Sequence, residues 1–129
     1  MSHHFIDVLG TVTIGANTTI GGRDTHFWSH SRFYDEALSP QLEAIDIKVG
    51  KNSYVGARAT LIGCSIPEGA IVGAGSIVNK SFENDKNYNF LIAGNPAKIK
   101  KRYFRTQHTP ESKEIENRPD ENKSKSSTA

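Results

Sequence analysis

Two histidines, His26 and His30, are the best candidates for chemistry in this sequence, and both lie in the aromatic-rich segment RDTHFWSHSRFYDEALSPQLEA. A neutral imidazole can take a proton from an alcohol near neutral pH, so a general base is the expected role. Asp35 or Glu36 could orient His30. A metal site built on the two histidines is not expected, because no third set of ligands is apparent.

The segment around these histidines, about residues 22–45, interrupts the pattern of the chain on both sides of it. It is too long for a simple turn, and we interpret it as a loop that leaves one corner of a regular scaffold. Long excursions from compact scaffolds are usually functional or disordered. The aromatic residues argue against disorder. The loop is therefore the expected place for chemistry.

The scaffold is predicted by a period of about six residues between positions 49 and 78. Aliphatic residues mark this period at Val49, Val55, Leu61, Ile66, Val72 and Val78. Four of them are followed directly by a turn-forming residue, at Gly50, Gly56, Pro67 and Gly73. This period fits neither a helix nor an alternating strand and is typical of a hexapeptide parallel β-helix. The aliphatic side chain points to the coil axis, and the small residue lets the backbone turn.

An earlier block of the same repeat is expected in residues 5–22. Val8, Ile14 and Ile20 are six residues apart, and Gly15 and Gly21 occupy the corner positions. The first coil has no coil above it, and a solenoid end normally needs a cap. We therefore expect another chain to cover this end, or a shortened version of a longer architecture.

The single cysteine, Cys64, lies where the repeat tightens. Leu61 and Ile66 are only five residues apart, which predicts a tight corner around Gly63 and Cys64. No Lys, Arg or His is adjacent in sequence to stabilise a thiolate. Cys64 is thus expected to be a small buried or corner residue and not a nucleophile.

The repeat ends after Val78, and the last part of the chain has a different composition. A short apolar strand is expected at residues 91–92, a turn at residues 94–96 and a short basic helix at residues 97–104. From residue 105 onward the sequence has no aromatic residue and is too polar to build a core. These residues, 105–129, are expected to form a disordered tail beyond a domain of residues 1–104.

Composition limits the class of protein. The chain has 129 residues, 36% of them hydrophobic, one Cys and a net charge of +2, which suits one modest domain. The lone Cys excludes an internal disulfide framework and fits a reducing compartment. No secretory signal and no apolar run of about 18 residues is apparent. The small net charge gives no reason to expect nucleic acid as a partner. A soluble, cytoplasmic protein without a membrane span is expected.

Three segments, IDIKVGKNSYVGARATLIG, EGAIVGAGSIVNKS and IAGNPAKIKKR, together resemble the hexapeptide-repeat O-acetyltransferases, a family that includes maltose, galactoside and polysaccharide acetyltransferases. The resemblance covers roughly residues 8–104. It implies an all-β fold: a left-handed parallel β-helix of hexapeptide repeats with an excursion loop and a short C-terminal helix. It also implies a homotrimer that transfers acetyl from acetyl-CoA, bound between neighbouring coils, to a hydroxyl of a sugar or glycan precursor.

The resemblance also suggests site residues. Phe27-Trp28-Ser29-His30 looks like the family's hydrophobic-x-Ser/Thr-His pattern, so His30 is the candidate base and His26 its rival. The positions that match the family's coenzyme A contacts are Ala57, Ala74, Gly75, Ser76, Lys80, Pro96, Lys98 and Lys101. Of these, the small residues would contact the pantetheine, Pro96 would lie near the adenine, and the lysines suit the phosphates as compact cations. No metal is expected.

Two departures from the family keep other functions open. Many members have a second His or an Asp after the catalytic His, where this chain has Ser31 and Arg32. Sugar acetyltransferases of this group also carry additional N-terminal coils. The alternatives are therefore a catalytically silent β-helix scaffold, an N-acetyltransferase acting on an amino-sugar, and a zinc enzyme similar to γ-carbonic anhydrases. The last needs three histidines at a trimer interface, which the spacing does not supply convincingly.

Overall fold

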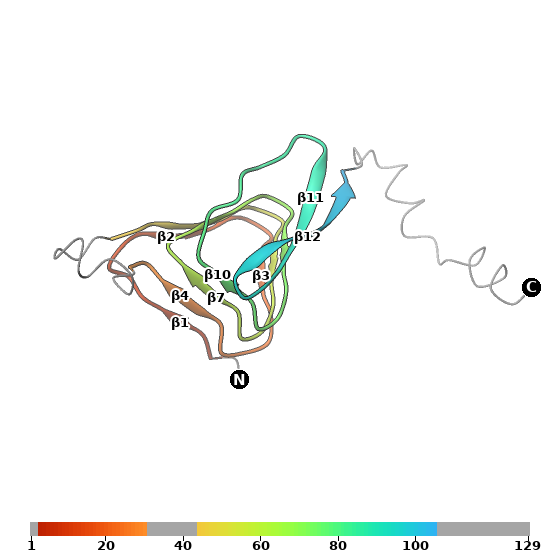
Figure 1. Ribbon diagram of the computed structural model, residues 1–129. Coiled ribbons are helices and arrows are strands. Elements are labelled where there is room, and N and C mark those ends of the chain that lie inside the picture. Colours follow the sequence, from red (N-terminus) through yellow and green to blue (C-terminus); the bar gives the residue numbers. More distant parts are fainter. Residues whose placement is uncertain (1–2, 31–43, 106–129) are drawn as a thin grey trace, which may run out of the picture.

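The chain winds into a triangular coil whose three sides are short β-strands (Figure 1). The structure is a computed structural model and describes residues 3–30 and 44–105. Within these ranges there are twelve strands and no helix, so none of the described segments is a helix that could span a membrane. The strands are β1 (Phe5–Ile6), β2 (Val12–Ile14), β3 (Thr19–Ile20), β4 (His26–Trp28), β5 (Ile47–Val49), β6 (Tyr54–Val55), β7 (Thr60–Ile62), β8 (Ser65–Ile66), β9 (Ile71–Val72), β10 (Ile77–Val78), β11 (Tyr88–Gly94) and β12 (Ala97–Phe104).

Each side of the triangle is a sheet that runs along the coil axis. Sheet A has the order β1-β4-β7-β10, sheet B the order β2-β5-β8, and sheet C the order β12-β11-β9-β6-β3. Every pairing is parallel except that of β11 with β12. Successive coils therefore stack directly on each other, at the usual strand spacing of about 4.8 Å.

The interior is built from ladders of aliphatic or aromatic side chains that stack from coil to coil along each side. In sheet A, Ile6 is in register with Phe27, which pairs with Leu61, and Leu61 pairs with Val78. The last three are fully buried. The same ladder runs through Ile14, Val49 and Ile66 in sheet B and through Ile20, Val55, Val72 and Ile92 in sheet C. The predicted period of six residues is thus the repeat of the core.

The corners require backbone conformations that favour particular residues. Asn17, Asn52 and Gly69 have positive φ angles of 57°, 57° and 70° at the corner between sheets B and C. Asn and Gly tolerate this region best. At Gly56, an added Cβ would lie 2.6 Å from the backbone nitrogen of Ala74 in the next coil. A side chain there would force the coils apart.

The basic helix predicted for residues 97–104 is wrong. This segment is strand β12, which folds back antiparallel on β11 and forms the edge of sheet C. Ala97 and Ile99 pack against the core, whereas the basic residues are exposed. Tertiary pairing with β11 overrides the helix propensity of the lysines. The apolar strand predicted at residues 91–92 is the middle of the longer strand β11.

Two details of the N-terminal half also differ from the sequence interpretation. The coil continues through β4, so the loop does not begin at residue 22; of the predicted loop, residues 31–43 lie outside the described residues. Phe27 is the inward residue of this strand, and its aromatic side chain hid the aliphatic period. Val8 is not part of the core ladder: it follows β1 and is 76% exposed, while Ile6 takes the inward position.

Asp35, Glu36 and nearly all of the predicted tail, residues 106–129, also lie outside the described residues.

Cys64 is buried, and burial raises the pKa of its thiol to about 12. Because the thiolate is the reactive form, we expect Cys64 to resist alkylation in the folded protein at about pH 8 and to react fully in denaturant. Mass spectrometry after timed exposure to iodoacetamide measures this. Rapid labelling of the folded chain would contradict the packing of this corner.

Candidate active site

The best-defined polar constellation joins Asp7, Ser29 and His30. His30 Nδ1 lies 2.7 Å from Asp7 Oδ2, and the Ser29 hydroxyl donates to the same carboxylate oxygen at 2.7 Å. The Ser29 backbone N–H donates to this oxygen as well, at 3.1 Å. The His30 and Asp7 side chains are 30% and 19% exposed, so the pair lies at the surface but is partly shielded from water.

The stacking of the first two coils creates this contact between residues 23 positions apart. Phe5 pairs with His26 and Ile6 with Phe27, so Asp7 follows β1 directly above the end of β4. The Asp7 N–H donates to the Phe27 carbonyl at 2.8 Å, which fixes the height of the carboxylate. Both residues lie at the corner between sheets A and B. The His30–Ala44 bridge joins the two described segments at this corner.

Ser29 is fully buried and acts as the support of the pair. Besides Asp7 Oδ2, its hydroxyl lies 2.9 Å from the Asp7 carbonyl oxygen, and it accepts the Gly10 N–H at 2.8 Å. The hydroxyl therefore connects both sides of the Asp7 turn. A side chain held in this way keeps the carboxylate oriented toward His30.

The arrangement fixes which nitrogen of His30 can act. An ionised carboxylate only accepts hydrogen bonds, so Nδ1 carries the proton in the bond to Asp7. In the neutral imidazole, Nε2 is then unprotonated and available to accept a proton. This is the arrangement of a general base whose tautomer is set by a carboxylate.

Asp7 stays ionised under acid conditions that protonate ordinary aspartates. The hydrogen bond from the Ser29 hydroxyl, with the bond and charge of His30, holds the pKa of Asp7 below its ordinary value of 3.8, against the opposing effect of desolvation. A lowered pKa in the folded state stabilises the fold above about pH 4, and this contribution is lost as the pH falls through the folded-state pKa.

We therefore expect Asp7→Asn to lower the free energy of unfolding at about pH 6, with the difference from wild type shrinking at about pH 3. Urea titrations at the two pH values measure this. Asp46→Asn is the matched control, because Asp46 Oδ1 accepts one exposed bond, from the Thr11 N–H. A difference from wild type that grows on acidification would contradict the ion-pair geometry.

The same Asp7→Asn substitution is expected to lower the turnover of any reaction that uses His30 as a base. The loss should be about ten- to a hundredfold, because a carboxamide no longer selects the tautomer. The substitution should lower kcat and leave the KM of the substrate that gives up the proton unchanged. Steady-state kinetics measures it, again with Asp46→Asn as the control, and an unchanged kcat would exclude a role for Asp7.

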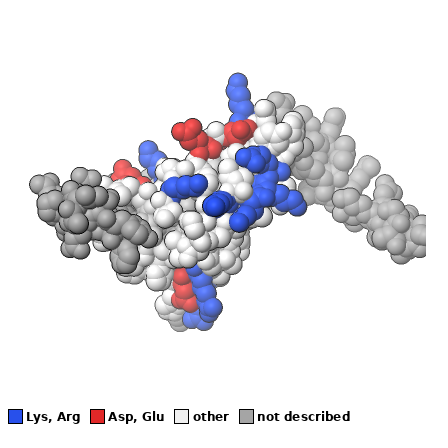
Figure 2. All heavy atoms as spheres, in the orientation of Figure 1, with Lys and Arg blue, Asp and Glu red and all other residues white. Residues whose placement is uncertain are grey.

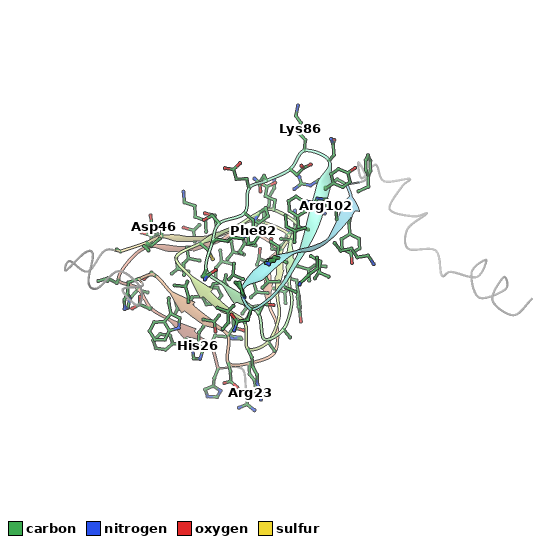
Figure 3. All side chains as sticks on the ribbon, in the orientation of Figure 1. Arg23, His26, Asp46, Phe82, Lys86 and Arg102 are labelled. Carbon is green, nitrogen blue, oxygen red and sulfur yellow. The ribbon has the colours of Figure 1, made fainter. Side chains whose placement is uncertain are left out.

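Sequence reasoning missed Asp7 and proposed Asp35 or Glu36 as the partner of His30. A signal existed, since aligning the segment FID of the first coil with HFW of the second places Asp7 beside Trp28. The rival base, His26, lies on the outer face of β4, away from the coil interior (Figure 3). Among the described residues, His30 is the histidine that pairs with a carboxylate.

The small residues suggested to contact coenzyme A lie at the corner between sheets C and A. Ala57 and Ala74 occupy this corner in successive coils, where the Gly75 N–H donates to the Ala57 carbonyl at 2.9 Å. Gly75 has a φ of 70°, and an added Cβ would meet no atom within 4 Å. The corner therefore presents an open surface of backbone and methyl groups. Such a surface allows close approach of an extended ligand.

Ser76 and Pro96 belong to the same corner in different ways. Ser76 is buried, and its hydroxyl accepts the Gly94 N–H at 3.2 Å. It thus holds the turn between β11 and β12, which contains Pro96, against the corner. Pro96 is exposed. Ser76 supports the surface, while Pro96 forms part of it.

Strand β12 is strongly basic. Figure 2 shows Lys and Arg atoms gathered along it. The two predicted lysines are exposed, Lys98 opposite Ala93 and Lys101 opposite Leu91, and Lys101 Nζ lies 5.6 Å from the Tyr103 ring. Lys100 and Arg102 on the same strand were not predicted. Lys100 Nζ lies near Gly94 at the turn.

Lys80 lies elsewhere. It follows β10 at the corner between sheets A and B, and its Nζ is 5.2 Å from the centre of the Phe82 ring. It is therefore on the His30 side of sheet A, farther along the axis, whereas the other candidate donor residues lie at the opposite corner or on sheet C. Within residues 3–30 and 44–105, no group of three or more His, Cys, Asp or Glu side chains could hold a metal ion.

Comparisons with known proteins agree with this fold. Residues 46–80 match a family model described as the hexapeptide repeat of succinyl-transferase. Among solved structures, the polySia-specific acetyltransferase NeuO is 28% identical, with 76% of this chain and 48% of NeuO covered and a TM-score of 0.52. Galactoside acetyltransferase in complex with coenzyme A is 21% identical, with 82% and 56% covered and a TM-score of 0.65.

The chain resembles the hexapeptide-repeat acetyltransferases. The predicted resemblance and the left-handed β-helix are thereby confirmed. A mutant of AntD, an N-acyltransferase from Bacillus cereus in complex with dTDP and coenzyme A, is 19% identical, with 82% of this chain and 57% of AntD covered and a TM-score of 0.52. The chain spans about half the length of these solved structures. The comparison with curated proteins gave no match.

Proposed function

We propose that the protein is an acetyl-CoA-dependent O-acetyltransferase that uses His30 as general base and acts on a hydroxyl of a sugar or glycan precursor. The observation that carries the proposal is the 2.7 Å contact of His30 Nδ1 with Asp7, on a fold shared with acetyltransferases. A histidine with a fixed tautomer at a partly shielded surface is the group that this reaction needs.

A single base, His30, can both take up and return the one proton that the reaction moves. His30 Nε2 takes the proton of the acceptor hydroxyl as its oxygen forms a bond to the thioester carbonyl carbon. The carbon–sulfur bond then breaks, and coenzyme A leaves with the proton that the imidazolium returns. Asp7 stabilises the transient imidazolium, because its carboxylate stays ionised. The products are the acetyl ester and the free thiol.

The donor would be held by the open corner and the basic strand. The methyl and backbone groups of Ala57, Ala74 and Gly75 suit a pantetheine chain, which is thin and needs close approach. Lys98 and Lys101 suit the phosphates, and Pro96 lies between these two regions on the β11–β12 turn. Lys100 and Arg102 add charge to the same strand. Lys80 could contact coenzyme A only from the far side of sheet A.

Within one chain, the base His30 lies far from this donor corner. Residues 59–63 cross sheet A from the Ala57 corner to the His30 corner, and five extended residues span on the order of 15 Å. Arg23 and Asp46, labelled in Figure 3, mark these two corners. A complete site therefore needs the His30 corner of one copy beside the donor corner of another. The expected homotrimer would provide that contact in a closed ring.

N-acetylation of an amino-sugar is the second candidate, supported by the similarity of the fold to the N-acyltransferase AntD. An amine that is protonated in solution also has to lose a proton, so the same base would serve it. Offering matched amino- and hydroxy-sugars to the protein separates the two reactions.

A calorimetric titration with acetyl-CoA tests the donor half of the proposal. Wild-type protein should bind in the micromolar range, and Lys98→Ala/Lys101→Ala should weaken binding about ten- to a hundredfold through lost charge-assisted hydrogen bonds. Lys48→Ala/Lys51→Ala is the matched control, since Lys48 on β5 and Lys51 in the turn after it are exposed and belong to a different strand from Lys98 and Lys101. Absence of binding by a folded wild type would favour a silent scaffold.

A further inference from the structure

The outer face of sheet A carries a row of aromatic rings that ends at His30. Phe5 and His26 are cross-strand partners with ring centres 5.6 Å apart, and Phe5 and Trp28 are 4.6 Å apart. Trp28 stands edge-on to His30, with centres 6.1 Å apart and an angle of 81° between the rings. We call Phe5, His26 and Trp28 the aromatic patch.

The patch faces outward because side chains alternate along β4. Phe27 points inward and is fully buried, so His26 and Trp28 on either side of it point away from the core. Phe5 is 44% exposed, and the other two are partly exposed. Aromatic rings on the outside of a coil contribute little to its core, so the row needs another explanation.

We infer that the aromatic patch is the acceptor subsite and that it stacks against an uncharged sugar ring. This inference rests on the proposed function and specifies its substrate class. A pyranose has a face of C–H groups and a rim of hydroxyls. An aromatic face carries negative charge density that attracts C–H groups, and the three rings, tilted by 35° to 60° to one another, offer faces and edges that a sugar ring can contact. Such an orientation directs a rim hydroxyl to His30.

The outward residues of sheet A favour an uncharged acceptor over an anionic one. The outward positions of sheet A among the described residues are Phe5, His26, Trp28, Thr60, Ile62 and Ile77. None of these side chains is a Lys or Arg that would pair with a carboxylate or phosphate. Asp7, which stays ionised beside His30, repels such groups. An uncharged acceptor would differ in this respect from the polysialic acid in the name of NeuO.

Trp28 is the only tryptophan of the chain, so its fluorescence reports on the patch without any need for turnover. Titration of the full chain with methyl β-galactoside and methyl α-glucoside should give a saturable change. Methyl glucuronoside and N-acetylneuraminic acid, which are anionic, should bind at least about tenfold more weakly. The measurement requires no acetyl-CoA.

Phe5→Ala should weaken the response to the neutral glycosides about three- to tenfold, the range expected for one stacking partner. Tyr54→Ala is the matched control, because Tyr54 is an equally exposed aromatic residue on sheet C. In kinetics, Phe5→Ala should raise the KM for the acceptor and leave the Kd for acetyl-CoA unchanged.

Three results would overturn the inference: no saturable change with neutral glycosides in folded protein, equal binding of the anionic sugars, or a Trp28 shielded from acrylamide because a second copy covers the patch. Calorimetry with acetyl-CoA on the same samples separates these results from failure of the proposed function. Unchanged acetyl-CoA binding without a glycoside response would refute the acceptor subsite and leave the proposed acetyl transfer standing.

Discussion

Replacing His30 by Asn is expected to lower kcat for acetyl transfer by about 10²–10⁴-fold, the usual contribution of a general base. The Kd for acetyl-CoA should stay unchanged, because the proposed contacts of coenzyme A are with Ala57, Ala74, Gly75 and the lysines of β12 and not with the His30 side chain. The fold should also be retained, with only a small loss of stability from the missing His30–Asp7 bond, since the side chain is partly exposed and Asp7 keeps its bonds from Ser29. Thiol release with a glycoside acceptor measures kcat, and calorimetry measures Kd.

Two other histidines, His3 and the rival base His26, supply the controls for this result. His3→Asn changes an exposed residue whose backbone carbonyl alone takes part in the structure, and it should behave as wild type. His26→Asn should raise the KM for the acceptor, because His26 belongs to the aromatic patch. A loss of kcat in His26→Asn that equals the loss in His30→Asn would contradict the assignment of the base.

Phe27→Ala is expected to lower the free energy of unfolding by about 3–5 kcal/mol, the usual cost of emptying a buried Phe site. Phe27 is 0% exposed and contacts the aliphatic ladder at the coil that carries His30. The coils on either side are held by backbone ladders, which limits how far the cavity can collapse. Urea denaturation followed by circular dichroism measures the change.

Phe104→Ala removes the same atoms from a surface site that is 71% exposed, so its effect should stay below about 1 kcal/mol. Phe27→Leu should recover most of the lost stability, because Leu fills the same position in the next coil. Equal effects of Phe27→Ala and Phe104→Ala would contradict the inward assignment of Phe27 and, with it, the outward assignment of Trp28.

The sequence predicted the repeat of the fold where the inward residue is aliphatic and the corner is glycine, as at Val55 and Gly56. The prediction of the repeat failed where the inward residue is not aliphatic or where the corner has a different length. Phe27 replaces an aliphatic residue, and the corner at Gly22 has one residue more than the corner at Ala57, which shifts the period. Strand β12 was mistaken for a helix because its pairing partner, β11, determines its conformation and local propensity does not.

His30 was predicted from a local pattern of four residues, and its role stays a proposal. Its partner Asp7 was not predicted, because the contact depends on the register of β1 with β4 and not on proximity in sequence. The donor residues were suggested by the resemblance. Only the structure shows that Ala57, Ala74, Gly75, Ser76 and Pro96 meet at one corner and that Lys80 does not.

Subunit complementation tests the central claim most directly, namely that His30 of one copy acts beside the donor corner of another. His30→Ala removes the base, and Ala74→Phe fills the exposed donor corner without disturbing the core. Each variant alone should be inactive. Co-assembled in equal amounts, they should recover about a quarter of the wild-type rate, the fraction of contacts that join an intact His30 to an intact corner in random rings. Mixed oligomers without activity would contradict the account.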